Sequence, residues 1–277
     1  MGRRCCALLL LSELAVYLLI VPATATAQTL GQKPDRPNIL WLVAEDMGPE
    51  LGVYGTEHVR TPNLDSLAAA GMFFTNVFTT SPVCSPSRSA LNTGMYQFTI
   101  GAHDHRSHRP NDPSPYPHPL PEGVQIVSDW LRQAGYFTGN IVDFPEEVSF
   151  SGTGKTDWNF SYEGRPFDTA DWSEMTSHSP FYGQVHFQLT HRGGLWDRAD
   201  ELVKDPINSS EVDVPPYYPD HPVVRDSWAQ YLNAVTVLDS RMGKVLNQLR
   251  VSEVADSTIV IVTADHGPAA PRQAVAL

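Results

Sequence analysis

Two uninterrupted apolar runs constrain the fold of this chain more than any other feature. Residues 38–44 read NILWLVA and residues 258–263 read TIVIVT. Runs of this kind are typical of strands that are buried on both faces of a sheet. Acidic residues stand at the end of both runs: Glu45 and Asp46 follow the first, and Asp265 lies just beyond the second. The sequence therefore predicts buried strands whose carboxyl ends carry carboxylates.

Helical patterns separate the predicted strands. A helix is expected from Pro62, which suits the first helical position after Thr61, to about Ala70. Residues 227–250 repeat apolar side chains at the spacing of one face of a long amphipathic helix. A second helix is expected at 124–133, and residues 87–92 are expected to open a further helix. Strands are expected at 137–142 and 181–189, and a strand or extended segment at 72–79. Strands that alternate with helices predict an α/β fold with a largely parallel central sheet flanked by helices.

The strand-end carboxylates indicate a metal site. In open parallel sheets, ligands bind beyond the carboxyl ends of the strands, so Glu45, Asp46 and Asp265 are expected to meet there. Their oxygens suit Ca²⁺ or Mg²⁺, whereas the nitrogen of His266 suits transition metals. Calcium is therefore preferred, with magnesium as the alternative. One such pair alone could equally cap a helix, but recurrence at two strands favours a metal.

The first residues of the chain resemble a leader. Arg3 and Arg4 precede a mostly apolar stretch at 7–21, and small residues at 25–27 form a cleavage site. Residues 1–27 are therefore predicted to be a signal peptide, and the protein is expected to be exported to a periplasmic, extracellular or lysosome-like compartment. No later stretch approaches the roughly 20 apolar residues of a membrane span. We therefore expect no membrane span once the leader is removed.

The charge of the chain restricts its partners. Its formal net charge is −12, and loss of the leader, with two arginines and one glutamate, makes it −13. This acidity argues against binding to nucleic acid and to anionic membrane surfaces. Any site for an anion must therefore be local and built from a few cations.

One cysteine remains when the leader is removed. Cys5 and Cys6 lie in the leader, which leaves Cys84 without an internal disulfide partner. A lone cysteine is usually a small buried apolar residue, but the neighbouring residues here favour chemistry. Pro86 fixes the backbone before a helix whose free N–H groups attract an anion. Arg88 adds a guanidinium group that is always positively charged and can donate two parallel hydrogen bonds to an oxyanion. The segment thus offers a reactive side chain at an anion site beside a divalent cation.

The CSPSR sequence from Cys84 to Arg88, with Thr-Gly at 93–94, resembles the defining motif of the cysteine-type, formylglycine-dependent type I sulfatases. PNIL at 37–40, TPNLD at 61–65 and TADHG at 263–267 are also similar to that family. The resemblance covers about residues 36–272. It implies an alkaline-phosphatase-like fold, with an incomplete N-terminal catalytic domain at 36–277.

The resemblance also implies a mechanism. A maturation enzyme would convert Cys84 to formylglycine, whose hydrate, with one oxygen on the metal, attacks the sulfur of a sulfate ester or sulfamate. The second hydroxyl then expels sulfate and restores the aldehyde. The metal acts as a Lewis acid, and fixed cations stabilise the transferring group. Sulfated carbohydrate is the expected substrate.

Individual residues match family roles. Those matching the metal site are Glu45, Asp46, Cys84, Asp265 and His266. Arg88 matches the residue that orients the formylglycine, and Lys155 the lysine that contacts the sulfate. His191 matches the histidine near the leaving group. Arg272 resembles an arginine of sulfamidase-like members, the branch towards which this chain leans.

Three features depart from the family pattern. Glu45 stands where aspartate is usual, and Asp157 where a histidine is usual; His103 or His105 could replace that histidine. The chain stops 11 residues after His266, so we expect its C-terminal part to be missing. We therefore expect the chain alone to fold poorly or to have little enzymatic activity. Two alternatives stay open: a phosphodiesterase or phosphonate hydrolase of the same superfamily, and an inactive, truncated binder of sulfated glycans.

Overall fold

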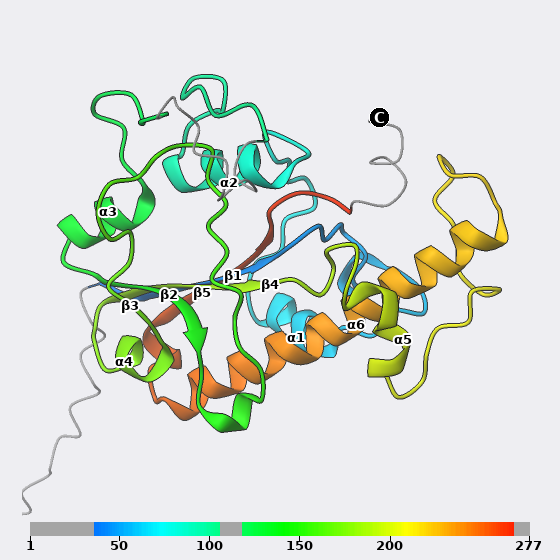
Figure 1. Ribbon diagram of the computed structural model, residues 1–277. Helices are drawn as coiled ribbons and strands as arrows, with labels where there is room; N and C mark the ends of the chain where they lie inside the picture. Colours follow the sequence, from blue (N-terminus) through cyan, green and yellow to red (C-terminus); the bar gives the residue numbers. More distant parts are fainter. Residues whose placement is uncertain (1–35, 106–117, 269–277) are drawn as a thin grey trace, which may run out of the picture. The chain divides into compact units, whose positions relative to one another are not determined.

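The computed structural model describes residues 36–105 and 118–268, all within a compact unit that spans residues 34–277. The predicted signal peptide, residues 1–27, and Arg272 lie outside the described residues. A five-stranded sheet runs through this unit in the order β3-β2-β4-β1-β5, and all four strand pairings are parallel (Figure 1). The strands are β1 (Asn38–Ala44), β2 (Phe137–Asp143), β3 (Thr169–Asp171), β4 (Phe181–Phe187) and β5 (Thr258–Ala264).

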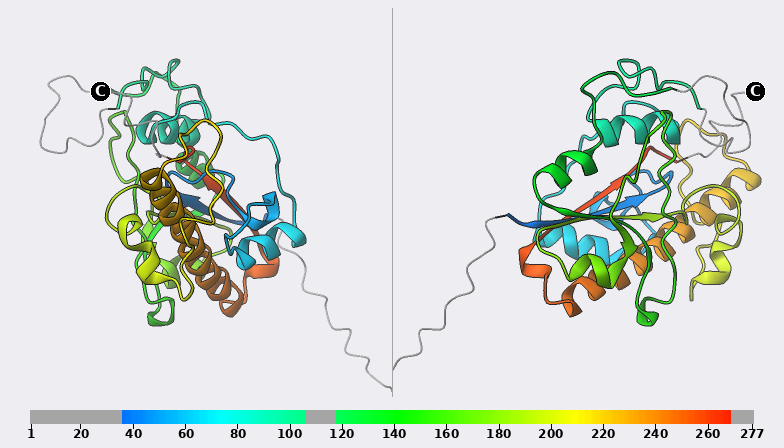
Figure 2. Two further views of the ribbon diagram at one scale, coloured as in Figure 1. Left: turned by 90° about the vertical axis from the view of Figure 1, so that its right-hand side faces the viewer. Right: turned by 60° about the vertical axis from the view of Figure 1, so that its left-hand side comes forward.

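Helices cover both faces of the sheet. The α-helices are α1 (Pro62–Ala70), α2 (Cys84–Thr93), α3 (Val127–Gln133), α4 (Trp172–Thr176), α5 (Ala199–Leu202) and α6 (Pro222–Val251). Short 3₁₀ helices form at Gly52–Tyr54, Glu146–Val148, Trp196–Arg198 and Ala255–Ser257. Helices α2 and α3 lie on one face, and α1, α4 and α6 lie on the other (Figure 2). None of the helices in the described part of the chain has the length and apolar composition needed to cross a membrane.

The main apolar core lies between the sheet and α6. Leu40 and Val185 from the sheet and Leu238 from α6 are fully buried in one cluster. Gly183 allows β4 to approach α4, because a Cβ atom there would lie 2.3 Å from the sulfur of Met175. A smaller cluster forms elsewhere around Ile126. Apolar burial of this kind is the main force that holds helix and sheet layers together.

The structure confirms the predicted α/β fold with a parallel sheet, and adjusts several boundaries. The long helix begins at Pro222, before the expected position 227, and α3 begins at Val127. Helix α2 begins at Cys84 itself, so Pro86 lies in its first turn, where a missing N–H is tolerated.

One burial prediction is wrong: β5 is an edge strand whose side chains at Ile259 and Ile261 are 49% and 40% exposed, so the run at 258–263 is not buried on both faces. An apolar run predicts a strand, but it does not specify which layers pack on each face.

Residues 72–79 do not form a strand, so of the two alternatives predicted for them only a segment outside the sheet remains. These residues pair with none of the five strands, and their apolar side chains face outward, with Met72 78% and Phe78 87% exposed. Apolar composition alone does not form a strand, because the backbone also needs a neighbouring strand for its hydrogen bonds.

Candidate active site

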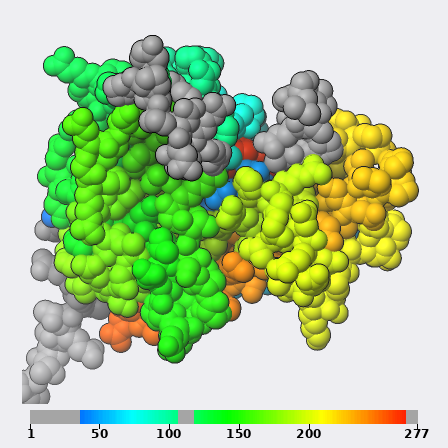
Figure 3. Space-filling model, viewed as in Figure 1, coloured from blue at the N-terminus to red at the C-terminus, as the bar shows by residue number. Residues whose placement is uncertain are grey.

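The sheet topology brings the acidic strand ends together. β1 and β5 are neighbours in register, with Ala44 opposite Ala264, so the residues that follow them meet at one edge. The backbone N–H groups of Asp46 and His266 donate to Asp265 Oδ1 at 3.0 and 2.9 Å. In Figure 3 the blue and red segments that follow these two strands reach the surface side by side. The predicted meeting of carboxylates therefore occurs.

Helix α2 adds Cys84 to this edge. Asp46, Cys84, Asp265 and His266 are all buried, and each offers one ligand atom within 4.8 Å of the others. His266 Nε2 lies 3.1 Å from Cys84 Sγ and 3.1 Å from Asp46 Oδ1. Its Nδ1 lies 2.8 Å from the carbonyl oxygen of Gly267, which can only accept, so Nδ1 carries a hydrogen and Nε2 faces the cluster.

The donor set fits a divalent cation. Asp46 Oδ2 and Glu45 Oε1 are buried and make no hydrogen bond to the described residues. Buried carboxylate oxygens without partners are costly, and a cation among them would remove that cost. Asp46 also holds a left-handed backbone conformation, with φ of 54°, which is uncommon for residues other than glycine, although aspartate adopts it more often than most.

Glu45 lies slightly apart from the other predicted metal ligands. It does not belong to the group of four described above. Its Oε2 accepts a hydrogen bond from Lys155 Nζ at 2.9 Å, and its Oε1 lies 3.9 Å from Arg88 Nη2. The longer glutamate side chain thus reaches Lys155, which was predicted to contact the sulfate, and Arg88, which was predicted to orient the formylglycine.

The Cys84 thiol lies between two histidines. Burial raises the pKa of Cys84, but hydrogen bonds with His191 and His266 outweigh it, and the net pKa is lowered. The bond to Cys84 raises the pKa of His191 against the opposing effect of burial. Burial also lowers the pKa of His266, yet its bonds to Asp46 and Cys84 raise it to about 11.

Arg88 and Lys155 bring fixed positive charge to this edge. Arg88 is 2% exposed, and its Nε donates to Asp265 Oδ2 at 2.9 Å. Its Nη1 donates to the carbonyl oxygen of Lys155 at 3.2 Å. Burial by itself lowers the pKa of Lys155, but the neighbouring carboxylate of Glu45 has the opposite effect, and the net pKa is raised above its ordinary value. The structure therefore gathers every predicted site residue that it describes.

The residues considered as substitutes for the family histidine lie in different places. His105 Nδ1 is 2.9 Å from Ser85 Oγ, one residue after Cys84. His103 instead stacks on Phe98, with ring centroids 5.5 Å apart. Asp157 Oδ2 lies 3.7 Å from Lys155 Nζ. His105 is thus the histidine of the two that contacts the motif.

Sequence reasoning missed His186. This residue of β4 is 4% exposed, and its Nδ1 lies 3.0 Å from Arg88 Nη1. A signal was present, because Tyr182, Gln184 and His186 alternate within a strand that is otherwise apolar. Polar residues at alternate positions of a fully buried strand must find partners on one face.

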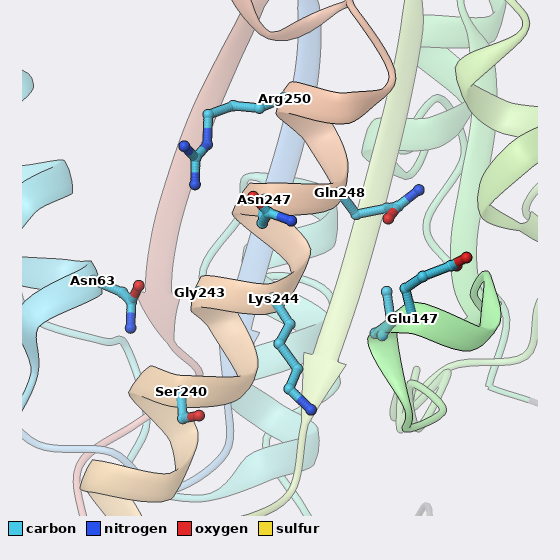
Figure 4. Close-up of a pocket in the computed structure, with 9 residues that line it drawn as sticks. Asn63, Glu147, Ser240, Gly243, Lys244, Asn247, Gln248 and Arg250 are labelled. Carbon is cyan, nitrogen blue, oxygen red and sulfur yellow. The ribbon is translucent and has the colours of Figure 1, made fainter.

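A separate pocket of about 390 Å³ lies along α6 (Figure 4), and none of the predicted site residues that the structure describes lines it. Asn63, Lys244, Asn247 and Arg250 are among its polar lining residues. Lys244 Nζ donates to Ser149 Oγ at 2.6 Å. This pocket is therefore distinct from the buried cluster at the strand ends.

Comparison with known proteins identifies the class. The sulfatase family model matches residues 37–276. Among the solved structures that the chain resembles is a 2-O GAG sulfatase, with a TM-score of 0.60, 18% identity, and coverage of 84% of this chain and 58% of that one. A sulfatase structure from Bacteroides fragilis is 24% identical, with a TM-score of 0.59 and coverage of 84% of this chain and 62% of that one. The fold is therefore the alkaline-phosphatase-like fold of the sulfatases, as expected.

Curated relatives agree. The chain is 32% identical to an ulvan-active sulfatase of Formosa agariphila, over 87% of this chain and 45% of the relative. It is 30% identical to human N-sulphoglucosamine sulphohydrolase, over 89% of this chain and 54% of the relative. The chain thus belongs to the sulfatase family and spans about half the length of these curated relatives.

Proposed function

We propose that this protein hydrolyses sulfate esters or sulfamates of a sulfated carbohydrate. The observation that carries the proposal is the buried group of Asp46, Cys84, Asp265 and His266, with Arg88 and Lys155 directly beside it. Carboxylates that can hold a cation, next to two permanent cations, suit a tetrahedral anion. Both curated relatives described above are named for action on sulfated substrates.

The proposal includes a metal and a modified cysteine. Asp46, Asp265 and His266, with Glu45 nearby, would hold Ca²⁺ or, alternatively, Mg²⁺. A maturation enzyme would convert Cys84 to formylglycine. The cation supplies Lewis-acid polarisation and a template for the reacting group.

The other residues act through their positions. Arg88 is held by Asp265, and Lys155 by Glu45, so that both place positive charge at the edge where the sulfate would lie. Such preorganised charge stabilises the transferring group more strongly in a buried site than in water. His191, which is half-buried, would protonate the leaving oxygen or nitrogen; the support is its interaction with Cys84, which raises the pKa of the imidazole.

We also propose that the protein is exported. The support is the leader pattern of residues 1–27, and the destination would be periplasmic, extracellular or lysosome-like. Export would bring the enzyme to carbohydrate polymers outside the cytosol.

Mass spectrometry of the peptide that contains Cys84, after co-expression with a formylglycine-generating enzyme, tests the proposal first. Conversion lowers the peptide mass by about 18 Da. An unconverted peptide would favour an inactive glycan binder.

The converted protein would then be assayed on aryl sulfate, aryl phosphate and aryl phosphonate esters. Preference for the phosphorus esters would instead indicate a phosphodiesterase or phosphonate hydrolase.

A second assay narrows the substrate. Sulfated sugars that carry either an O-linked or an N-linked sulfate would be compared by release of inorganic sulfate. Release from the N-linked compounds alone would place the protein with the sulfamate hydrolases, and release from the O-linked compounds alone with the ester hydrolases.

A further inference from the structure

Strand β4 is buried on both faces, but the two faces differ in chemistry. Phe181, Val185 and Phe187 enter the apolar core. The alternate positions Tyr182, Gln184 and His186 point to the opposite face, as strand geometry requires. Buried polar side chains are retained only where they are hydrogen-bonded. The polar side chains of β4 must therefore form hydrogen bonds with the groups that pack on this face.

The partners of this face lie on α2. His186 Nδ1 is 3.0 Å from Arg88 Nη1, and its Nε2 is 3.1 Å from Gln184 Oε1. A guanidinium can only donate, so Nδ1 accepts from Arg88, and Nε2–H donates to Gln184. These contacts select one neutral tautomer of the imidazole.

The remaining bonds close a ring around Arg88. Gln184 Nε2 donates to the hydroxyl of Tyr182 and, at 3.3 Å, to Asn92 Oδ1. Asn92 Nδ2 donates in turn to the backbone carbonyl of Arg88 at 3.0 Å. The guanidinium and the backbone of Arg88 are thus both tied to one buried network.

Burial, together with the charges of Arg88 and Lys155, holds the pKa of His186 well below its ordinary value. A neutral imidazole next to an arginine avoids repulsion between like charges and offers a lone pair. The charge state agrees with the tautomer that the geometry selects.

We propose that His186 is a positioning residue that fixes the orientation of the Arg88 guanidinium. With Nη1 held by His186 and Nε held by Asp265, the remaining nitrogen, Nη2, is aimed at the acidic edge, 3.9 Å from Glu45 Oε1. This inference rests on the proposed sulfatase function, because it assumes that Arg88 acts on the modified residue 84 or on the sulfate.

The test compares two substitutions of similar size and polarity in the protein that has been matured to formylglycine. In His186→Asn the amide oxygen can take the place of Nδ1 and accept from Arg88, whereas in His186→Gln the amide reaches the place of Nε2. We expect kcat on an aryl sulfate to fall less than about 3-fold for the asparagine variant. For the glutamine variant we expect a loss of about 10- to 100-fold, the rate equivalent of one lost charge-assisted hydrogen bond.

A double-mutant cycle shows whether the effect passes through Arg88. His186→Phe should lower kcat at least about 10-fold in the native background, because it removes the same charge-assisted hydrogen bond. It should change kcat little when Arg88→Lys is already present. His178→Phe is the matched control, because His178 is exposed and stacks on Phe137 away from the cluster. It should leave kcat unchanged.

The outcomes separate the two proposals. Equal kcat losses for the asparagine and glutamine variants, or additive effects of the two substitutions in the cycle, would overturn the positioning role. A lower melting temperature with unchanged kcat would do the same, since it would show a purely structural role. If the native protein releases no sulfate although residue 84 is converted, the proposed function itself is wrong.

Discussion

The two sides of β4 show two ways of holding a buried strand. Towards α4 and α6, Phe181, Val185 and Phe187 pack in an apolar cluster that needs no particular partner. Towards α2, Gln184 and His186 are equally buried but make directional hydrogen bonds to named atoms. Apolar burial scales with area and tolerates repacking, whereas a hydrogen bond depends on atoms at set distances. The first side should therefore govern stability, and the second should govern activity.

The largest expected effect comes from removing the proposed nucleophile on the α2 side. Cys84→Ser should lower kcat at least about 10³-fold, because a serine that is left unconverted carries no aldehyde hydrate. The change in volume is small, so the melting temperature should stay within a few degrees. Turnover of aryl sulfate and thermal unfolding measure the two quantities. Appreciable turnover by the serine variant would contradict the role given to Cys84.

The next effect concerns the apolar side of β4 and the stability of the fold. Leu238→Ala in α6 removes a fully buried side chain of the core and should lower the free energy of unfolding by about 2–5 kcal/mol. At temperatures where the variant is folded, kcat should be unchanged. Val223→Ala on the same helix is the control, since Val223 is 68% exposed and should change stability by less than about 0.5 kcal/mol. Urea denaturation gives both values. A kcat loss in the folded leucine variant would show that the two sides are coupled.

Calcium should stabilise the protein through the strand-end carboxylates. At a free concentration about 100 times its Kd, a ligand bound to the native state alone adds about 2.7 kcal/mol. Calcium should therefore raise the melting temperature of the native protein, and a chelator should reverse the effect. Asp46→Asn should abolish this response, because it removes the charge of a buried carboxylate at the site. Asp143→Asn, at the exposed end of β2, should retain the response. Equal responses from both variants would place the cation elsewhere.

The smallest effect concerns the outer end of the polar network. Tyr182→Phe removes the hydroxyl that accepts from Gln184 and should cost about 1 kcal/mol of stability. Because Tyr182 does not contact Arg88, kcat should change less than about 2-fold. Thermal unfolding and aryl sulfate turnover measure these changes. A kcat loss as large as that of His186→Gln would show that the network acts as one unit.

Much of the candidate site could be predicted because its signals are local in sequence. The CSPSR segment places Cys84 and Arg88 within one helical turn, and the apolar runs place Asp46 and Asp265 at strand ends. Sheet topology needed only to make β1 and β5 neighbours for these residues to meet. The pairing of Glu45 with Lys155 was not predicted, because it depends on where a distant loop passes.

The amino-acid sequence by itself determined the alternation of strands and helices, the CSPSR segment and the acidic strand ends. It could do so because periodicity and local motifs depend on neighbouring residues. Only the tertiary structure decided that His186 accepts from Arg88, 98 positions away, and that residues 72–79 remain unpaired. Directional bonds between remote side chains depend on the packing of whole elements, and no local pattern specifies that packing.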